Sequence, residues 1–308
     1  MRRCGGGDSS RVRLAGMKLA TLRTSFGTCA IRIDGPNVGT ELDYENVGEL
    51  LASPDWRKAA QLSGEPVVFD DADLAPVIPN PGKIICVGVN YAKHAREMGR
   101  ELPTQPTLFI KFPEALTGPF DDVYVPDYAT KKLDYEGELA VVIGRRAHRV
   151  PVAEALGHVA GYAIMNDYTL RDYQRATTQF HAGKSFYRTA GFGPWLTTTD
   201  EWAPGKAARL VTTVDGEVRQ DDNTDDLIFS VAELIAFCSS LYPLNPGDVI
   251  ATGTPEGVGF ARGEEALLGD GSRTRISIEG LGAIENTTRF GEPPAAGGCG
   301  EGCICHGR

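Results

Sequence analysis

The sequence K-L-D-Y-E-G-E-L-A-V-V-I-G occupies residues 132–144, and G-Y-A-I-M-N-D occupies residues 161–167. Both stretches contain an apolar run of the kind expected for a buried strand. Glu136 and Glu138 stand two residues apart at the start of the first run, so on a strand their side chains point to the same face. Asp167 ends the second run. The pattern therefore predicts two carboxylates side by side and a third at the end of another buried segment.

Carboxylates held at one site repel each other, which raises a carboxyl pKa unless a cation lies between them. Three hard oxygen ligands with room left for water or substrate suit Mg²⁺, Mn²⁺ or Ca²⁺ better than Zn²⁺. The simple alternative is that all three residues are exposed at strand ends. A bare E-x-E pattern does not decide between these two interpretations.

Length and charge limit the class of protein. The chain has 308 residues, 42% of them hydrophobic, which is enough for one large domain plus a small one. Its net charge of −10 disfavours a nucleic-acid partner, which requires basic patches. No apolar run approaches the roughly 18–20 residues that span a bilayer, and no apolar core follows Arg2 and Arg3 as in a signal peptide. We therefore expect a cytoplasmic protein with no membrane partner.

The seven cysteines fall into two groups. Cys29, Cys86 and Cys238 have apolar neighbours and are predicted to be buried thiols. The other four lie in Gly-rich terminal segments: Cys4, Cys299, Cys303 and Cys305. The last three, with His306, offer ligands for a soft metal, but their spacing matches no zinc pattern, and a tail with incidental cysteines is the favoured interpretation.

The order of segments predicts a β-rich α+β fold. We expect a disordered tail over residues 1–16, a small N-terminal domain over 17–78, a catalytic domain over 79–291 and a Gly/Cys-rich tail over 292–308. The clearest local signal is a hairpin over residues 210–220, which turns at Asp215-Gly216. Helices are predicted over 90–99 with Asn90 as its cap, over 168–175 and over 229–241, whereas 183–186 is predicted as a loop.

Five ordered segments resemble the fumarylacetoacetate hydrolase family. They are G-V-N-Y-A-K-H-A-R-E-M-G, L-D-Y-E-G-E-L-A-V-V-I-G, G-Y-A-I-M-N-D-Y-T-L-R-D-Y-Q, G-K-S-F and P-G-D-V-I-A-T-G-T-P-E-G-V-G. The resemblance covers about residues 79–291. It implies a mixed β-roll or β-sandwich catalytic domain, a homodimer, and a divalent metal, Mg²⁺ or Mn²⁺, held by Glu136, Glu138 and Asp167.

The resemblance also implies a chemistry. Family substrates are small β-diketo or 2-oxo acids, often from the degradation of aromatic compounds. Breaking a C–C bond next to a carbonyl leaves a carbanion that must be held as an enolate, a charge that a divalent ion stabilises as a Lewis acid. The leading prediction is a hydrolase that cleaves a C–C bond in an acylpyruvate- or fumarylpyruvate-like acid. The alternatives are a 2-hydroxy-dienoate isomerase, a 2-oxo acid decarboxylase, and a protein that binds a small acid without turnover.

His94 and Glu97 are the predicted proton-transfer pair. They stand three residues apart on a predicted helix, so they are neighbours on one helical face. His94 is the predicted general base because its ordinary pKa is near neutral, and Glu97 would orient it. Gly88 and Gly99 flank the helix, which suits a lid that orders on binding.

Five further residues are predicted to meet the substrate. Lys184 is expected to stabilise an oxyanion, and Thr254 in its Gly-rich turn is expected to bind a carboxylate. Arg171 and Gln174 are candidates to hold a second carboxylate or a carbonyl, although Arg171 pairing with Asp172 or Glu256 is an equal alternative. Lys111 is a further candidate for the pocket lining.

The chain departs from the commonest family pattern directly after G-K-S-F. Many members have an aspartate there that helps to position substrate, whereas this chain has Tyr187-Arg188-Thr189. Our hypothesis at this point is that Arg188 favours a substrate with an additional carboxylate.

Overall fold

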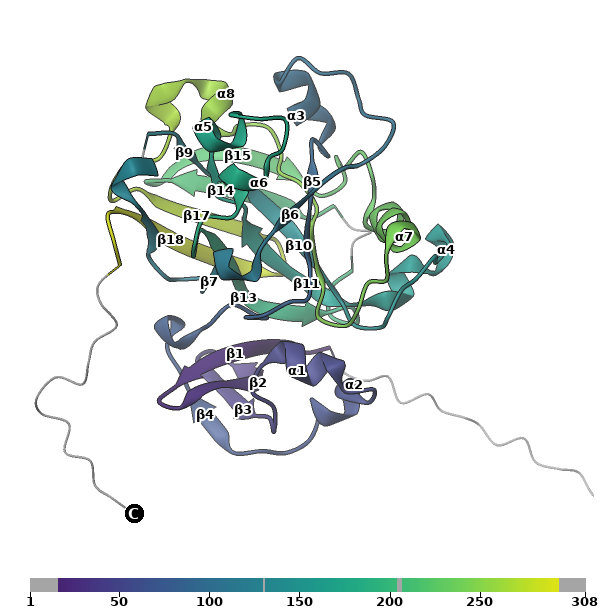
Figure 1. Ribbon diagram of the computed structural model, residues 1–308. Coiled ribbons are helices and arrows are strands. Elements are labelled where there is room, and N and C mark those ends of the chain that lie inside the picture. Colours follow the sequence, from purple (N-terminus) through teal and green to yellow (C-terminus); the bar gives the residue numbers. More distant parts are fainter. Residues whose placement is uncertain (1–15, 130, 204–206, 294–308) are drawn as a thin grey trace, which may run out of the picture.

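The computed structural model describes residues 16–129, 131–203 and 207–293. Within these ranges the strands form an eleven-stranded sheet, a five-stranded sheet and a two-stranded sheet, and the helices are short. The predicted β-rich α+β fold class is therefore confirmed. Figure 1 shows a lobe made by the N-terminal elements below a larger body.

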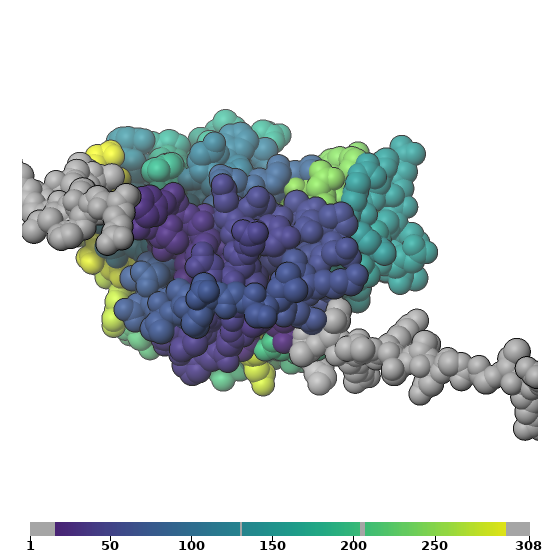
Figure 2. Space-filling model, turned by 90° about the horizontal axis from the view of Figure 1, so that it is seen from below, coloured from purple at the N-terminus to yellow at the C-terminus, as the bar shows by residue number. Residues whose placement is uncertain are grey.

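The N-terminal lobe consists of strands and two short helices. They are β1 (Lys18–Thr24), β2 (Gly27–Gly35), β3 (Val38–Glu41), α1 (Val47–Ala52), α2 (Trp56–Ala59) and β4 (Pro66–Val68). The antiparallel pairing of Leu19 with Leu196 joins β1 to β13 (Ala190–Thr198) of the body. Figure 2, seen from the side of the lobe, shows its purple and blue residues in front of the body. The domain division at residues 78 and 79 stays a prediction, and the large sheet runs on across it.

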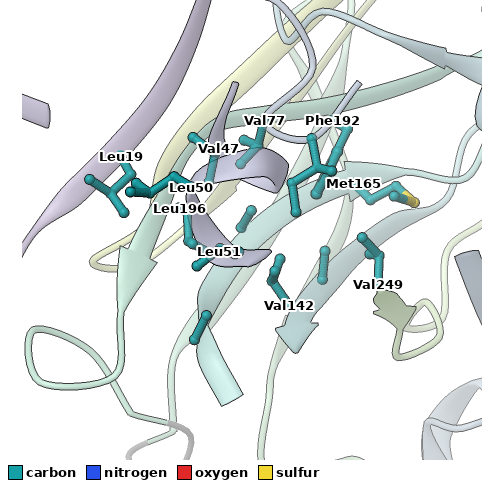
Figure 3. Packing of buried hydrophobic residues seen from close by; sticks show 14 of the residues in the cluster. Leu19, Val47, Leu50, Leu51, Val77, Val142, Met165, Phe192, Leu196 and Val249 are labelled. Atoms are coloured by element: carbon teal, nitrogen blue, oxygen red, sulfur yellow. The ribbon is translucent and has the colours of Figure 1, made fainter. Parts of the chain in front are cut away.

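A hydrophobic cluster fixes the lobe to the body (Figure 3). Leu50 and Leu51 of α1 lie in this cluster with Leu196 of β13, and all three are at most 1% exposed. Val142 and Met165 from the middle of the body belong to the same cluster. Because burying a Leu or Met side chain is worth about 1.5–3 kcal/mol, this contact holds the lobe firmly.

The strands that carry the acidic residues lie in the middle of the large sheet, whose order is β4-β3-β2-β1-β13-β11-β10-β16-β5-β6. Their bounds are β5 (Ile84–Gly88), β6 (Thr107–Lys111), β10 (Gly137–Ile143), β11 (Val159–Asn166) and β16 (Val249–Ala251), and β7 (Leu116–Thr117) pairs with β13. Every residue of β10 and β11 is buried. Burial on both faces explains why these strands have continuous apolar runs instead of alternating ones.

The five-stranded sheet packs on the middle of the large sheet. Its strands are β8 (Val123–Val125), β14 (Arg209–Val214), β15 (Glu217–Asn223), β17 (Arg273–Ile278) and β18 (Gly282–Phe290). Leu139 and Val141 of β10 share one buried cluster with Leu210 of β14 and Ile276 of β17. The predicted hairpin is confirmed as β14–β15, with positive φ at both turn residues, Asp215 and Gly216.

The remaining elements are short, apart from α7. They are α3 (Ala92–Glu97), β9 (Leu133–Asp134), α4 (Val152–Ala155), β12 (Thr169–Leu170), α5 (Arg171–Gln174), α6 (His181–Lys184), α7 (Val231–Leu241) and α8 (Gly259–Arg262). Figure 1 shows α3, α5, α6 and α8 together at the top of the view, at the end opposite the N-terminal lobe. The helix predicted over residues 229–241 corresponds to α7, which Ser230 caps through a reciprocal bond pattern with Glu233.

Three local predictions were wrong. The segment predicted as a helix over residues 168–175 starts as strand β12, because Thr169 and Leu170 pair with Asp134 and Leu133, and only α5 is helical. Residues Gly183 and Lys184, predicted in a loop, belong to α6. Asn90 is not the cap of α3, since its side chain bonds the backbone oxygens of Thr252 and Phe229 instead. In each case a contact distant in sequence overrides the local signal.

The structure tests the predictions for three cysteines but not those for the terminal segments. Cys29, Cys86 and Cys238 are free and buried, as predicted. The predictions for residues 1–15 and 294–308, including Cys4 and the Cys/His tail, lie outside the described residues. In the part of the chain that the structure covers, no helix has both the length and the apolar character to cross a membrane.

Candidate active site

Three buried carboxylates meet where β10 begins and β11 ends. Gly137 of β10 pairs with Asn166 of β11, so Glu136 and Glu138 lie beside Asp167, the residue that follows β11. Oxygen atoms of the three carboxylates lie within 4.8 Å of one another. None of the three side chains is at a strand end in solvent, since Glu136 is 6% exposed and the other two at most 1%. The structure thus brings together the predicted metal ligands, and their role as ligands stays a proposal.

Cations compensate two of the three carboxylates. Lys184 Nζ lies 2.7 Å from both Glu136 Oε2 and Asp167 Oδ2. Arg171 Nη1 lies 2.7 Å from Glu136 Oε1. Burial raises the pKa of Glu136, but the charges of Lys184 and Arg171 outweigh it and lower this pKa to about 2. Both oxygens of Glu136 therefore accept from cations that keep it ionised.

Glu138 has a different environment. Its Oε2 accepts a hydrogen bond from Gly253 N at 3.0 Å. Burial, and then the negative charges of Asp167 and Glu136, raise the pKa of Glu138 well above its usual range. The ionised form of Glu138 consequently needs an additional cation nearby.

The donor set fits a divalent metal ion. Four buried carboxylates (Asp134, Glu136, Glu138 and Asp167) face three cationic side chains (Lys111, Arg171 and Lys184), which leaves one formal negative charge when all are ionised. One divalent cation at Glu136, Glu138 and Asp167 would turn this local charge positive, which suits an anionic substrate. Carboxylate oxygens without nitrogen or sulfur ligands are the choice of Mg²⁺, Mn²⁺ or Ca²⁺.

Lys111 lies behind the carboxylates. Its Nζ donates to Asp167 Oδ1 at 2.6 Å and to the backbone oxygen of Tyr168 at 3.2 Å, and it also contacts the backbone oxygen of Lys184. The side chain is buried and is not part of the cavity lining in the described residues. Its position suits the alignment of Asp167 rather than the substrate contact we predicted.

Arg171 is held by a carboxylate that sequence reasoning missed. Its Nε donates to Asp134 Oδ2 at 2.8 Å. Burial lowers the pKa of Arg171, but Asp134 and Glu136 together raise it above its usual value. The expected alternative partners, Asp172 and Glu256, were therefore wrong. Asp134 was detectable, since it stands two residues before Glu136 in the segment L-D-Y-E-G-E.

Lys184 reaches the carboxylates because α6 packs tightly on α5. A Cβ atom at Gly183 would lie 2.4 Å from Gln174 N and 2.5 Å from Leu170 O, so only glycine permits this approach. The charges of Asp167 and Glu136 outweigh burial and raise the pKa of Lys184. Two of its three N–H groups donate to carboxylates of the described residues, which leaves one for a substrate oxygen.

His94 and Glu97 form the predicted pair on α3. His94 Nδ1 lies 2.9 Å from Glu97 Oε2, and Glu97 Oε1 accepts from Gly257 N at 3.0 Å. Burial raises the pKa of Glu97, but the bonds from His94 and Gly257 outweigh it and lower the pKa below its usual value. Since an ionised carboxylate only accepts, His94 carries its proton on Nδ1. In the neutral ring, Nε2 is then the proton acceptor, and the ring lines the cavity.

The cavity at this end of the body has a volume of about 110 Å³. Seven predicted site residues line it: His94, Glu136, Glu138, Arg171, Gln174, Lys184 and Thr254. The hydroxyl of Thr254 donates to Gly137 O at 2.9 Å and accepts from Gln220 Nε2 at 2.8 Å. This hydroxyl is therefore committed to the protein, which weakens the predicted role of Thr254 in binding a substrate carboxylate.

Gln220 and Asn166 are two supporting residues that sequence reasoning missed. Gln220 Oε1 accepts from Gly137 N at 3.0 Å, and Asn166 Oδ1 accepts from Glu136 N at 3.1 Å. They fix the backbone on both sides of the first glutamate. Asn166 directly precedes Asp167, so its position in the sequence could have indicated a role at the site. Nothing in the sequence of the hairpin indicates such a role for Gln220.

Arg188 does not lie at the cavity. Its Nη2 is 3.1 Å from Asp121 Oδ2, and neither Arg188 nor the exposed Tyr187 belongs to the described lining. The hypothesis that Arg188 reads an additional substrate carboxylate therefore loses its structural basis.

Comparisons with known proteins agree with this geometry. The model of the fumarylacetoacetate (FAA) hydrolase C-terminal family matches residues 83–289. Oxaloacetate tautomerase YisK of Bacillus subtilis is 43% identical over 71% of this chain and 73% of its own length. The mitochondrial oxaloacetate tautomerase FAHD2A of Bos taurus is 41% identical over 69% of this chain and 68% of its own length.

Solved structures are similar across most of the chain. A putative HpcE protein from Mycobacterium smegmatis superposes with a TM-score of 0.81 at 31% identity, covering 90% of this chain and all of that one. The fumarylacetoacetate hydrolase of Exiguobacterium antarcticum has a TM-score of 0.75 at 32% identity, covering 89% of this chain and 99% of that one.

Proposed function

Because the chain belongs to the fumarylacetoacetate hydrolase family, we propose that it is a metal-dependent tautomerase that interconverts the enol and keto forms of a small 2-oxo acid such as oxaloacetate. The sequence alone favoured C–C hydrolysis. The similarity to two oxaloacetate tautomerases, at 41% and 43% identity, supports tautomerisation as the first candidate instead.

The observation that carries the proposal is one cavity that contains both an acidic cluster and a base of fixed tautomer. Glu136, Glu138 and Asp167 would hold Mg²⁺ or Mn²⁺, with Ca²⁺ as a further candidate. When bound, such an ion supplies Lewis-acid stabilisation of negative charge on a 2-oxo or enolate oxygen. Every other part of the proposal rests on side chains of this protein.

The reaction conserves all atoms and needs no redox partner. In the direction from enol to keto, the O–H bond at C2 breaks and a C–H bond forms at C3. His94 Nε2 accepts and returns a proton in this exchange, while Glu97 holds the ring through Nδ1. Lys184 directs its remaining N–H toward the oxygen where charge develops, and its raised pKa keeps it charged.

Hydrolytic C–C cleavage is the second candidate. The His94–Glu97 pair is also the arrangement expected for activating a water molecule, and Gly257 N anchors it. Decarboxylation and isomerisation of a dienoate require the acidic cluster and enolate stabilisation without an attacking water. We also keep as proposals the homodimer, the cytoplasmic location and the catalytic roles of the individual residues.

The test is a product analysis with Mg²⁺ and with Mn²⁺. Enol oxaloacetate and a series of 2,4-diketo acids are each mixed with the protein, the decay of the enol absorbance is followed, and the products are identified by NMR. We expect accelerated conversion of enol oxaloacetate to its keto form with no loss of carbon. Cleavage of an acylpyruvate without tautomerase activity would establish the second candidate instead, and binding without turnover would remove both.

A further inference from the structure

Two arginines at the cavity have no part in the proton transfer described above. Arg175 directly follows α5, and Arg100 lies just after α3, next to Gly99. Both line the cavity and both are exposed to solvent. The cavity therefore has cationic groups at its open side in addition to Lys184 and Arg171 at its buried side.

Arg171 is not free to bind an external carboxylate. Its guanidinium is engaged by Asp134 and Glu136, and its Nη1 donates to Gln174 Oε1 at 3.1 Å. A guanidinium group binds a carboxylate best through two parallel N–H groups. Arg171 Nε and Nη1 already donate to protein oxygens, and Nη2 is a buried atom that lies 2.7 Å from Asp134 Oδ2. The cation that meets a distal carboxylate must therefore be a different one.

Phe260 positions Arg175. The Arg175 Cζ atom lies 4.5 Å from the centroid of the Phe260 ring, and Arg171 Cζ lies 5.9 Å from the same centroid. The two distances together place the guanidinium carbons within about 10 Å of each other. The same ring therefore lies close to an arginine that is engaged by carboxylates and to an exposed one.

Asp134 connects the backbone of Phe260 to the acidic cluster. Its carboxylate accepts from Gly259 N at 2.8 Å and from Phe260 N at 2.9 Å, as well as from Arg171. The backbone at the start of α8, which carries Phe260, and the guanidinium of Arg171 are thus held by one buried carboxylate. Because Arg175 already stacks on the Phe260 ring, its side chain loses less conformational freedom when it binds an anion.

We propose that Arg175, stacked on Phe260 and assisted by Arg100, forms a subsite for the second carboxylate of a small 2-oxo dicarboxylic acid. The 2-oxo acid end lies at the acidic cluster, and the distal carboxylate meets the exposed guanidinium face. The subsite makes the protein selective for dicarboxylates over monocarboxylates of the same length. It rests on the proposed function for the placement of the 2-oxo acid end.

The test compares two acids that differ only at the distal group, malate and 2-hydroxybutyrate. Calorimetry with Mg²⁺ present gives the affinity of each for the wild type and for Arg175→Gln, Phe260→Leu and Arg100→Gln. We expect Arg175→Gln to weaken malate binding on the order of 10-fold and to leave 2-hydroxybutyrate within about twofold. Phe260→Leu retains the charge and is expected to show a smaller loss in the same direction.

The matched control is Arg96→Gln, an exposed arginine on α3 that does not line the cavity. It should change neither affinity. Equal weakening of both acids by Arg175→Gln, no change with either acid, or a wild type that does not bind malate would each overturn the subsite.

This experiment separates the subsite from the proposed function. Malate binding that depends on Arg175 in a protein without tautomerase activity would refute the proposed function and support the subsite. Tautomerase activity toward oxaloacetate that is unaffected by Arg175→Gln, in both kcat and KM, would refute the subsite alone.

Discussion

The floor and the rim of the cavity are built on different principles. The floor comprises residues that are at most 7% exposed: Glu136, Glu138, Asp167, Lys184 and Arg171. Ion pairs of 2.7 Å link Lys184 to Glu136 and Asp167, and Arg171 to Glu136. The rim comprises His94, Met98, Arg100, Arg175 and Phe260, which come from short helices and their flanking residues. Buried ion pairs fix geometry at a high cost if one partner is removed, whereas exposed charges contribute little to stability. The floor is thus suited to a fixed metal site, and the rim to adjustable contacts with substrate.

The largest expected effect is at the floor, for Glu138→Gln. The substitution preserves shape and removes the carboxylate that has no cationic partner at hydrogen-bond distance among the described residues. We expect the affinity for Mn²⁺ to fall by at least about 100-fold and the activity by about 1,000-fold. Calorimetric titration of Mn²⁺ measures the first quantity. Glu154→Gln on the exposed side of α4 is the control, and an affinity of Glu138→Gln within about threefold of the wild type would argue against the metal site.

The next largest effect is a difference in the free energy of unfolding between a floor variant and a rim variant. Arg171→Met leaves Asp134 and Glu136 without their shared cation, which is expected to lower the free energy of unfolding by about 3–5 kcal/mol. Arg175→Met alters only an exposed side chain, so we expect a change within about 0.5 kcal/mol. Urea unfolding of both variants without added metal provides the comparison. Similar losses in the two variants would show that floor and rim do not differ in this way.

Replacing His94 at the rim should impair catalysis without changing the binding of the metal ion. His94→Ala is expected to lower kcat by about 100- to 1,000-fold while the affinity for Mn²⁺ stays within about twofold. Glu97→Gln should have a smaller effect on kcat, because it weakens the control of the tautomer but leaves the imidazole in place. Loss of metal binding in His94→Ala would mean that α3 supports the floor, contrary to our description.

The smallest expected effect concerns pH and stability at the rim. The folded-state pKa of Glu97 is lowered, so its carboxylate adds stability above the unfolded pKa of about 4.3 and loses this contribution as pH falls through the folded pKa. The difference in unfolding free energy between wild type and Glu97→Gln should therefore be constant near pH 5 and shrink toward pH 3. Urea unfolding at several pH values measures this difference, and one that grows as the pH falls would contradict the assignment.

The sequence was informative where the site depends on neighbouring residues. Glu136 directly precedes β10 and Glu138 lies in it, while His94 and Glu97 share a helix, so period and spacing were sufficient to group them. Asp167 came from the end of a separate apolar run, and the pairing of β10 with β11 brings it to the glutamates.

Contacts between distant segments could not be predicted in the same way. The bond between Arg171 and Asp134 joins residues 37 apart, and it depends on the short pairing of β9 with β12 in a segment whose local pattern indicated a helix. Gln220 reaches Gly137 from a hairpin 83 residues away. The prediction that Arg188 binds a substrate carboxylate failed for a similar reason, because Asp121, two residues before β8, engages its side chain.

The central claim is that His94 exchanges the proton at C3 inside the cavity, and the most direct measurement follows that proton. Enol oxaloacetate is converted in D₂O with Mg²⁺, the keto product is trapped as malate by malate dehydrogenase and NADH, and NMR locates the deuterium at C3. The expected result is deuterium at a single prochiral position with the wild type and at both positions equally with His94→Ala. Deuterium at one position in both proteins would contradict the claim, because the proton would then come from a group other than His94.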